Sequence, residues 1–600
     1  MADSAVPVYI DEDVGKDDSS AVGTEQSPYK TLLYAHIQHP PKDKPQYLTR
    51  KSLTGPVGED GDTAARLNWL PATKSALKKA EKLYNQHLQK VARGDRIAIQ
   101  QKEEADKREL ALEDAKKIKI TQDPSLPAAT KIHLDEKVKL RSGKAAGDKE
   151  ERGTRVKVRG RIFQLRSQGG MIFLTLQDGY GQLQCVLSGK LTTTYEALTL
   201  TRQTSIEIYG EMCEAPATAH VPDDRELQAD YFEVIGKAPG GDDAFTTKAP
   251  PDADAQTRLD QRHLFIRGQT SSAVLKVRAA VLTAFRQSYR ETKPRCLEVT
   301  PPCMVQTQVE GGATLFSFDY YGQQAYLTQS SQLYLETCLP SLGDVFCVAP
   351  SFRAEKSLTR RHLSEYTHIE AELDFITFDD LLEHLEHVIS RVVELVMADE
   401  ETAKLIAQLN PKFKVPERPF LRMKYADAIQ WLVDHSIDNE DTQQPHKFGD
   451  DIAEAAERKM TDIIDRPIFL THFPVEIKAF YMKKDPSDLR VTESVDCLMP
   501  GVGEIVGGSM RMDNYEELME GYKREGIDPA PYYWYTDQRK YVIYSRSRLS
   551  LSLANCFSRY GTTPHGGYGL GLERFLAWIC DRHSVRECCL YPRFMSRCTP

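Results

Sequence analysis

The sequence predicts an α+β protein built from several domains. Three observations support this fold class: a long Lys- and Glu-rich stretch without proline, a series of short alternating strands, and a region of mixed strands and helices, at about 73–120, 154–238 and 257–600. A chain of 600 residues is long enough for several domains. We therefore expect an N-terminal extension, a small β-barrel, and a large domain in which helices flank an antiparallel β-sheet.

The first 120 residues predict an appended module that ends in a long helix. Residues 1–70 alternate short apolar runs with segments rich in Gly, Asp and Ser. The Lys- and Glu-rich stretch that follows carries a thin apolar stripe at helical spacing: Leu77, Leu83, Tyr84, Leu88 and Val91. Its mixed charge favours a solvated helix, and a basic arm that binds RNA phosphates is the alternative. Residues 121–153 then predict a basic linker.

The region 154–238 predicts the small β-barrel. Apolar and polar residues alternate in runs separated by Gly-containing turns, at 156–162, 172–176, 183–187 and 205–210. Arg166, Gln168 and Phe173 are expected on its surface, and such residues suit a barrel that binds nucleic acid. A barrel used only for packing is the alternative. The Gly-, Asp- and Pro-rich segment 239–256 predicts a hinge.

Composition excludes several classes of protein. The net charge of −9 argues against a protein that coats nucleic acid uniformly. The 12 cysteines are scattered without zinc-binding spacing, which favours a reducing compartment and no structural zinc. No apolar run approaches the length of a membrane span, so no membrane association is expected. The N-terminus lacks the pattern of a signal or transit peptide, and we expect a cytoplasmic protein.

The segment 344–375 carries the densest set of chemical groups in the chain. Two strand-like runs flank a polar turn at 356–360, which predicts a β-hairpin. Period-2 geometry puts Arg353 and Glu355 on one face of the first strand. It puts four polar or aromatic residues on one face of the second strand: His362, Tyr366, Glu370 and Glu372. Cations, carboxylates and a ring on one sheet face suit a bound nucleotide.

Three segments in this order resemble the sequence motifs of one enzyme family. The first, 271–302, is a helix followed by a strand that ends at Pro302, and the second is the hairpin at 345–375. The third, 567–579, begins Gly567-Tyr568-Gly569-Leu570-Gly571-Leu572-Glu573-Arg574. A dinucleotide-binding glycine motif does not fit. That motif requires a glycine three positions after Gly571, and this chain has Arg574 there. The chain resembles class II aminoacyl-tRNA synthetases of the aspartyl, asparaginyl and lysyl subgroup.

The resemblance is greatest to eukaryotic cytoplasmic asparaginyl-tRNA synthetases, and it covers 150–600 together with the N-terminal extension. It implies an OB-fold anticodon-binding domain at 154–238 and a class II catalytic domain at 257–600. It also implies a homodimer formed through the first motif. The expected partners are L-asparagine and tRNA(Asn). Phe173 would stack on a base of the anticodon, and Arg166 and Gln168 would contact the bases.

The same resemblance assigns the residues that activate the amino acid with ATP. Arg353 would bridge the substrate carboxylate and the α-phosphate, Glu355 would contact the adenine edge, and Tyr366 would stack on the base. Arg361, His362 and Arg574 would hold the β- and γ-phosphates, so that Arg353 and Arg574 are the expected catalytic residues. The complete expected ATP-binding set is Arg353, Glu355, Arg361, His362, Leu363, Tyr366, Glu504, Gly571 and Arg574.

The resemblance also implies Mg²⁺ ligands at Asp496 and Glu504, a role that suits carboxylates beside a triphosphate. Strict strand alternation would put Glu504 and Arg511 on opposite faces, although the family directs both to the site. We therefore expect a β-bulge, with Gly507-Gly508 as its predicted position.

A few residues are expected to distinguish asparagine from aspartate. Glu310 would bind the substrate ammonium, and Gln332 would lie beside the substrate. Leu335 stands where aspartyl enzymes have a lysine that would pair with an aspartate side chain. The neutral carboxamide of asparagine would instead receive a hydrogen bond from Arg511 and donate one to Glu336, directly or through water. Added negative charge would also repel aspartate.

The sequence departs from the family between 542 and 559, just before the third motif. The additional residues suggest a retained intron, and a genuine loop is the alternative; the mature transcript decides between them. If translated, the segment predicts a poorly ordered loop that impairs activity. The rival functions are an aspartyl or non-discriminating tRNA ligase, a catalytically impaired paralogue that binds tRNA or protein, and a free-standing asparagine synthetase.

Overall fold

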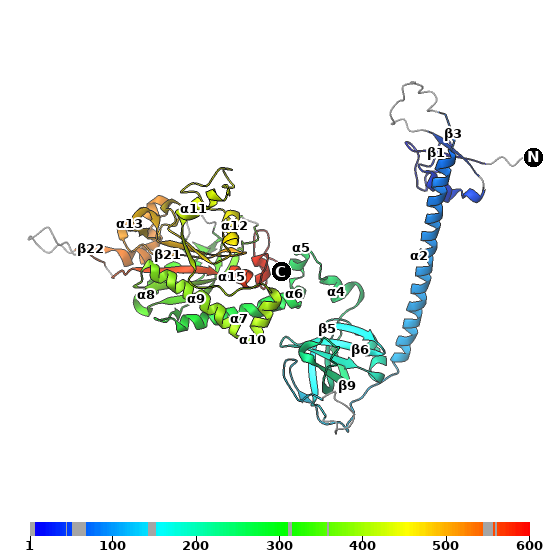
Figure 1. Cartoon of the computed structure of the whole chain (residues 1–600), viewed down its shortest axis with the longest axis horizontal. Coiled ribbons are helices and arrows are strands. Elements are labelled where there is room, and N and C mark those ends of the chain that lie inside the picture. The colour runs from blue at the N-terminus through cyan, green and yellow to red at the C-terminus, as the bar shows by residue number, and fades with distance from the viewer. Residues whose placement is uncertain are drawn as a thin grey trace, which may run out of the picture. The chain divides into compact units, whose positions relative to one another are not determined.

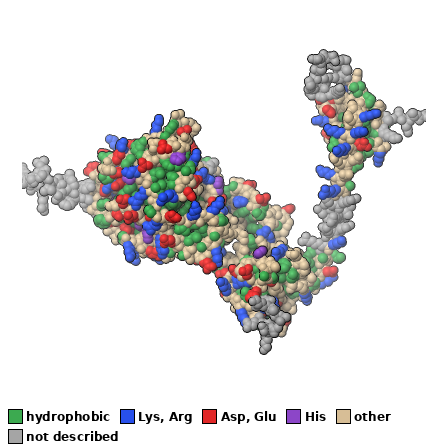
Figure 2. All heavy atoms as spheres, viewed as in Figure 1, with side chains coloured by type: hydrophobic (Ala, Val, Ile, Leu, Met, Phe, Trp, Pro, Cys, Tyr) green, Lys and Arg blue, Asp and Glu red, His purple; other side chains and the backbone are tan. Residues whose placement is uncertain are grey.

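A computed structural model describes residues 6–43, 45–50, 68–141, 152–309, 315–356, 359–543, 556–558 and 561–600 (Figure 1). The chain divides into two compact units, Met1–Gly240 and Gly241–Pro600. Figure 2 shows acidic and basic side chains interspersed over the visible face of the larger unit, as expected from the mixed composition. Within the described part of the chain, no helix combines the length and the apolar character that a membrane crossing requires.

The N-terminal part of the first unit combines a small three-stranded sheet with two helices: β1 (Pro7–Asp11), α1 (Leu32–Gln38), β2 (Gln46–Arg50), β3 (Leu70–Pro71) and α2 (Lys74–Ala115). Leu77 of α2 packs on the core of this module, which includes Val8 and Ile10. Further along α2, Leu83, Leu88 and Val91 are exposed. The predicted apolar stripe therefore contacts a core only near the start of the helix.

The predicted small barrel is confirmed in the second part of this unit. Its strands pair in the order β4-β5-β6-β7-β9-β8, and an additional β5–β8 pairing closes the sheet. These strands are β4 (Thr130–Lys131), β5 (Arg155–Gln168), β6 (Met171–Gln177), β7 (Gln182–Leu187), β8 (Ser205–Glu214) and β9 (Arg225–Gly236), with the short helix α3 (Tyr195–Leu198). Alternate residues fill the interior because side chains of a strand point to opposite faces.

The second unit contains the predicted antiparallel sheet flanked by helices. Eight strands pair in the order β10-β14-β15-β24-β21-β20-β17-β16, and only the outermost pairs at each edge are parallel. The strands are β10 (Leu297–Glu298), β14 (Val345–Phe352), β15 (Glu365–Asp374), β16 (Leu421–Lys424), β17 (Ile468–Thr471), β20 (Ser494–Met499), β21 (Gly503–Met510) and β24 (His565–Gly571).

Helices bury one face of this sheet. The main core joins it to α7 (Gln269–Glu291), α9 (Phe378–Ala398), α10 (Glu400–Leu409) and α15 (Leu572–Ile579). Further described elements of the unit include α4 (Phe245–Lys248), α5 (Ala255–Asp260), α6 (Arg262–Phe265), β11 (Met304–Val305), β12 (Ser317–Tyr320), β13 (Gln323–Leu327), α8 (Gln332–Leu342), α11 (Tyr425–Asp434), α12 (Glu454–Ile464), β18 (Lys484–Asp485), β19 (Asp488–Thr492), α13 (Tyr515–Glu525) and α14 (Tyr533–Thr536).

The opposite face of the sheet carries the polar residues of the predicted hairpin. In β15, Ile369, Ala371 and Leu373 point into the core, so the intervening residues point to the other face. The strands are shorter than predicted, since β14 ends at Phe352 and β15 begins at Glu365. Three predicted strand residues therefore lie in the connection between the strands: Arg353, Glu355 and His362.

A bulge in β21 places Glu504 on the polar face, but not where it was predicted. Cys497 pairs with Val506 and Leu498 pairs with Glu504, so that Ile505 is an extra residue in the ladder. The ladder through Gly507-Gly508 is regular on both sides, and that predicted position is wrong. Ile505 and Val506 both join the core, which reverses the alternation and directs Glu504 to the other face.

The ends of the suspected insertion form a short ladder. β22 (Tyr541–Ile543) pairs antiparallel with β23 (Cys556–Ser558). The poorly ordered loop was predicted at 542–559, of which 544–555 and 559 lie outside the described residues.

Candidate functional site

A cavity of about 900 Å³ lies over the polar face of the large sheet. It brings together residues that are more than 200 positions apart in the sequence, from the hairpin, β20, β21 and the third motif. Twelve of the residues predicted for the site line it: Gln332, Arg353, Glu355, Arg361, His362, Leu363, Tyr366, Asp496, Glu504, Arg511, Gly571 and Arg574.

One end of the cavity concentrates positive charge. The Nη1 atom of Arg574 donates to Glu504 Oε2 at 2.9 Å and to the Glu504 carbonyl oxygen at 3.2 Å. The guanidinium of Arg361 lies 3.6 Å from Glu457 and 3.8 Å from Glu504. These carboxylates hold both arginines in the cavity wall. A triphosphate that entered here would meet pre-positioned guanidinium groups.

The aromatic ring of the hairpin lies beside its cations. The Arg353 guanidinium is 5.6 Å from the centroid of the Tyr366 ring. His362 Nε2 lies 3.5 Å from Glu355 Oε2, and Glu355 Oε1 lies 3.9 Å from Arg353. The structure therefore gathers a flat ring, a carboxylate and a guanidinium at one place, which is the set of groups that a nucleotide base and phosphate require.

Two carboxylates converge over a glycine of β21. A Cβ atom added to Gly507 would lie 3.4 Å from Glu504 Oε1 and 3.5 Å from Asp496 Oδ1. Lys478 Nζ donates to Asp496 Oδ2 at 2.9 Å. Burial raises the pKa of Asp496 to about 6, against the effect of Lys478. Burial also opposes ionisation of Glu504, but the charges of Arg574 and Arg361 outweigh it and lower its pKa to about 2.

This carboxylate pair is suited to a cation that also binds substrate oxygens. Among the described residues, no group of three or more His, Cys, Asp or Glu side chains forms a metal site. A site held by protein ligands alone is therefore not found in that part of the chain. Mg²⁺ commonly binds through one or two carboxylates and completes its shell with phosphate and water, and Asp496 and Glu504 fit that description.

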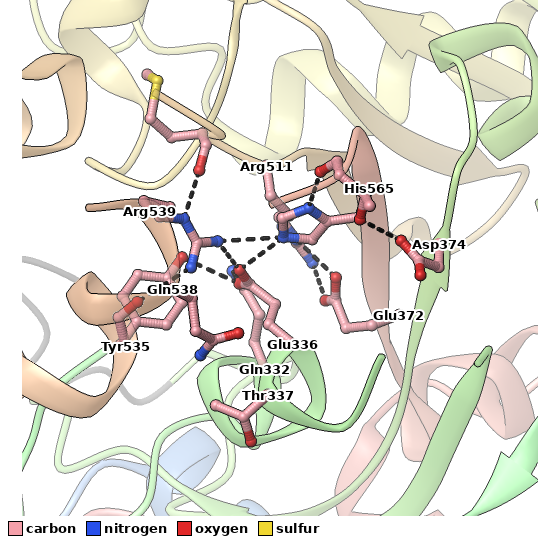
Figure 3. A network of polar contacts seen from close by, with 12 residues as sticks. Gln332, Glu336, Thr337, Glu372, Asp374, Arg511, Tyr535, Gln538, Arg539 and His565 are labelled. Atoms are coloured by element: carbon pink, nitrogen blue, oxygen red, sulfur yellow. Dashed lines mark hydrogen bonds and ion pairs between the residues drawn. The ribbon is translucent and has the colours of Figure 1, made fainter. Parts of the chain in front are cut away.

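A network of polar contacts joins two residues that line the cavity to a second layer of residues behind them (Figure 3). Gln332 and Arg511 line the cavity, whereas Glu336 and Glu372 lie behind them. Gln332 Nε2 donates to Glu336 Oε1 at 3.0 Å. Arg511 forms a bidentate pair with Glu372, in which Nε donates at 3.1 Å, and its Nη1 donates to Ser509 at 2.8 Å.

Glu336 has further partners from the last part of the chain. Its Oε2 accepts from Arg539 Nη2, and its Oε1 accepts from the hydroxyl of Tyr535 at 3.2 Å. His565 Nε2 lies 3.0 Å from Glu336 Oε2. Burial works against the charge of Glu336, but Arg539 and His565 outweigh it and hold its pKa below the usual range.

Two of the predicted specificity residues do not contact the cavity. Leu335 is fully buried and packs against Leu339, Val345 and Cys347. Glu336 is also buried and belongs to the second layer of the wall, and its contact with a substrate carboxamide, directly or through water, stays a prediction. Helical geometry explains both positions, because consecutive residues of α8 point in different directions. Glu310 lies outside the described residues.

The barrel carries a second cluster of predicted residues. The Arg166 guanidinium is 4.9 Å from the Phe173 ring centroid, and its Nη2 donates to Gln184 Oε1 at 3.3 Å. Gln184 Nε2 in turn donates to Glu226 at 2.9 Å. Gln168 lies at the end of β5, where it pairs with Met171 beside the turn. Gln184 and Glu226 were not predicted, although polar residues that alternate with apolar ones in a strand were a usable signal.

Comparison with known families agrees with this arrangement. A family profile described as "tRNA synthetases class II (D, K and N)" matches residues 254–547 and 552–595, which is more than half of the chain. The chain belongs to this family. A profile for an "Asparaginal-tRNA synthetase, N-terminal domain" matches 24–127, and one for an "OB-fold nucleic acid binding domain" matches 156–235. The break in the first match falls inside the suspected insertion.

Individual relatives in this class II family match over nearly the full length. The chain is 51% identical to the cytoplasmic asparagine–tRNA ligase of Saccharomyces cerevisiae, over 99% of this chain and 100% of that protein. It is 46% identical to the cytoplasmic enzyme of Homo sapiens, over 99% of both chains. Among solved structures, the Entamoeba histolytica asparaginyl-tRNA synthetase in complex with asparaginyl-adenylate matches with a TM-score of 0.67 and 43% identity, over 77% of this chain and 99% of that one.

For this class II synthetase, the sequence predicted the cavity-facing residues better than the residues behind them. Arg539, His565 and Tyr535 lie in the second layer with Glu336 and Glu372, and none of these three was predicted as a site residue. A clue was present in Arg539, since an arginine within the aromatic-rich segment 532–541 is unusual unless it finds a carboxylate. The identity of that carboxylate required the fold.

Proposed function

We propose that the protein is an asparagine–tRNA ligase that acts in the cytoplasm. It activates L-asparagine with ATP to form asparaginyl-adenylate and transfers the asparaginyl group to the 3′ end of tRNA(Asn). The observation that carries this conclusion is the near-full-length identity to ligases named for this activity, together with the structural match to a homologue holding asparaginyl-adenylate. The cavity supplies the groups that this chemistry requires.

Activation brings two anions together, so the enzyme must mainly position the reactants and neutralise charge. We assign Arg353 to the substrate carboxylate and the α-phosphate, since it lines the cavity beside the Tyr366 ring. Tyr366 would stack on adenine, and Glu355 would accept from the adenine amino group. Arg361, His362 and Arg574 would hold the remaining phosphates, with the backbone at Leu363 and Gly571 completing the nucleotide wall.

We assign Asp496 and Glu504 to Mg²⁺. When bound, the ion neutralises part of the charge on the triphosphate. Support comes from the space over Gly507, which both carboxylates border and which no side chain of the described residues fills. Lys478 holds Asp496 in place from the other side at 2.9 Å.

The amino-acid side chain would contact the first layer of the two-layered wall. Arg511 retains N–H groups beyond those that bind Glu372 and Ser509, and one of these would donate to the carboxamide oxygen. The Glu336 carboxylate only accepts hydrogen bonds, so the Gln332 side chain directs its Nε2 toward Glu336. The Oε1 atom of Gln332 would then accept a hydrogen bond from the NH₂ group of the substrate carboxamide. Glu310, which lies outside the described residues, remains the proposed partner of the substrate ammonium.

The barrel would bind the anticodon of tRNA(Asn). We assign base stacking to Phe173 and base contacts to Arg166 and Gln168, and extend this set to Gln184 because it holds Arg166. We place anticodon binding at 154–238 and catalysis at 257–600, with a homodimer formed through the segment 271–302. The profile matches at 156–235 and 254–595 support the two domain boundaries.

Pyrophosphate exchange with purified protein tests the function. We expect exchange with asparagine and not with aspartate, and charging of tRNA(Asn) with asparagine. Exchange with aspartate as well would indicate a non-discriminating enzyme, and exchange with neither would indicate an impaired paralogue. A free-standing asparagine synthetase would release asparagine from aspartate and would not charge tRNA.

A further inference from the structure

We propose that Arg539 is a specificity-determining positioning residue, which neutralises Glu336 and thereby makes the wall of the amino-acid subsite select a neutral carboxamide over a carboxylate. This inference rests on the proposed asparagine–tRNA ligase activity. It concerns a residue that does not line the cavity and therefore acts through other groups.

The wall behind the substrate side chain contains two closed ion pairs. Arg539 pairs with Glu336, and Arg511 pairs with Glu372. The side chains of all four residues are at most 3% exposed. Charges so deeply buried interact strongly, and each carboxylate offsets one guanidinium. The four charges therefore sum to zero.

His565 lies against the Arg539–Glu336 pair and contacts both of its members. Its Nδ1 lies 2.7 Å from the carbonyl oxygen of Thr563. Its Nε2 lies 3.0 Å from Glu336 Oε2 and 3.1 Å from Arg539 Nη2. The ring does not line the cavity, so its contacts are made with this pair and not with the substrate side chain.

This balance decides which side chain the wall can bind. Both guanidinium groups are committed to carboxylates, so the described wall offers no spare cation to a third carboxylate. Aspartate would bring such a carboxylate into a region already occupied by Glu336 and Glu372. Asparagine brings a neutral group that needs only a donor and an acceptor, which Arg511 and Gln332 supply.

The two pairs are close enough to influence each other. Burial works against the charge of Arg511, but Glu372 and, to a smaller extent, Glu336 outweigh it and raise its pKa above the usual range. The charge of Glu336 therefore reaches the guanidinium that lines the cavity. Removing either member of the Arg539–Glu336 pair would change the potential at the substrate side chain.

Arg539 also has contacts that any structural residue could make. Its Nε donates to the carbonyl oxygen of Met512 at 2.7 Å, its Nη1 donates to that of Tyr535 at 3.3 Å, and it lies 4.0 Å from the Tyr535 ring centroid. The test must therefore separate an effect of charge from a general loss of folding. The ratio of kcat/KM for aspartate to that for asparagine does so, because partial unfolding lowers both terms equally.

The experiment measures pyrophosphate exchange with both amino acids on single preparations of the full-length protein. In E336Q, the uncompensated charge of Arg539 should raise the aspartate-to-asparagine ratio by on the order of 100-fold. In R539M, the uncompensated Glu336 should lower kcat/KM for asparagine by on the order of 100-fold. The double variant R539M/E336Q should recover at least about 10-fold of that loss and return the ratio toward the wild-type value.

Two further variants serve as controls. R539K keeps the charge and should keep the wild-type ratio, even where both kcat/KM values fall. E386Q removes a buried carboxylate that pairs with the half-exposed Arg418, and it should leave the ratio unchanged. Glu386 does not line the cavity.

The outcomes are distinguishable. If E336Q leaves the ratio within about 3-fold of wild type, or if R539M/E336Q is no better than R539M, Arg539 is only structural and the inference is wrong. The comparison of R539M with the double variant stands alone if E336Q does not fold. Failure of the proposed function would show instead in the wild-type protein, as exchange with aspartate or with neither amino acid.

Discussion

Replacing Gly507 by alanine tests the proposed metal site with the smallest possible change. The added methyl carbon would lie 3.4 Å from Glu504 Oε1 and 3.5 Å from Asp496 Oδ1, which are ordinary van der Waals distances. The φ angle of Gly507 is outside the left-handed region, so alanine is conformationally allowed. We expect the free energy of unfolding to stay the same or rise by up to about 1 kcal/mol.

The effect on Mg²⁺ should be much larger than the effect on stability. The methyl group would fill the space that the two carboxylate oxygens share, so neither could keep the geometry that a small octahedral ion requires. Disturbing the surroundings of metal ligands typically costs between about 10- and 100-fold in affinity, or about 1.4 to 2.8 kcal/mol. The apparent Mg²⁺ requirement of pyrophosphate exchange should rise by that factor.

The assay is a Mg²⁺ titration of asparagine-dependent exchange at saturating ATP, with urea unfolding measured on the same preparation. Gly236→Ala is the matched control, because its added Cβ would lie 3.9 Å from Ser205 Cβ in the barrel, outside the catalytic unit. Its Mg²⁺ dependence should equal that of the wild type. An unchanged Mg²⁺ titration in Gly507→Ala would show that Asp496 and Glu504 do not share an ion at this place.

Four other predictions follow from single contacts. Tyr366→Ala should raise KM for ATP by about 10- to 100-fold through lost stacking, whereas Tyr366→Phe should change it less than about 3-fold. Equal KM values for ATP in the wild type and Tyr366→Ala would contradict this. Gly569→Ala should lower the free energy of unfolding by about 2 kcal/mol or more, because the added Cβ would lie 2.2 Å from His368 Nε2. Adding His368→Ala to this variant should partly restore the free energy of unfolding measured in urea. Burial lowers the pKa of His384 from 6.5 to about 3, so the unfolded state takes up the proton at a higher pH than the folded state. The free energy of unfolding should therefore fall by up to about 1.4 kcal/mol per pH unit as the pH decreases below 6.5. His384→Phe should flatten that slope in urea unfolding measured at several pH values. Phe173→Ala should raise KM for tRNA(Asn) by about 10-fold and leave exchange unchanged, and an equal effect on both assays would refute an anticodon role.

Local sequence patterns were sufficient to predict the elements that repeat a simple period. The barrel strands, the antiparallel sheet and the two strands of the hairpin all carry alternating residues, and the structure contains them. The period also identified Tyr366, Glu370 and Glu372 as neighbours on one face of β15. It failed at the strand ends, because alternation continues in the sequence beyond the last ladder hydrogen bond. Arg353 and His362 therefore lie in the connection but still line the cavity.

The bulge and the second layer of the wall required the fold. Strand alternation showed that Glu504 and Arg511 could not both face the site without an irregularity, but glycine content suggested the wrong position for it. The bulge occurs at Ile505, where two consecutive apolar residues both enter the core. Likewise, Glu336 and Arg539 lie 203 positions apart, and no local pattern relates them.

The same long-range pair explains how the suspected insertion and an ordered amino-acid wall coexist. Arg539 precedes the segment 542–559 and His565 follows it, yet Arg539 Nη2 lies 3.1 Å from His565 Nε2. The chain leaves and returns through paired strands, since Tyr541 pairs with Ser558 and Ile543 pairs with Cys556. Extra length between two paired ends raises the entropy of loop closure only slowly. Arg539 and His565 are thus held beside Glu336 by their own hydrogen bonds, while the β22–β23 ladder brings the two ends of the segment together. The wall of the amino-acid subsite is therefore ordered in a chain that carries the additional residues.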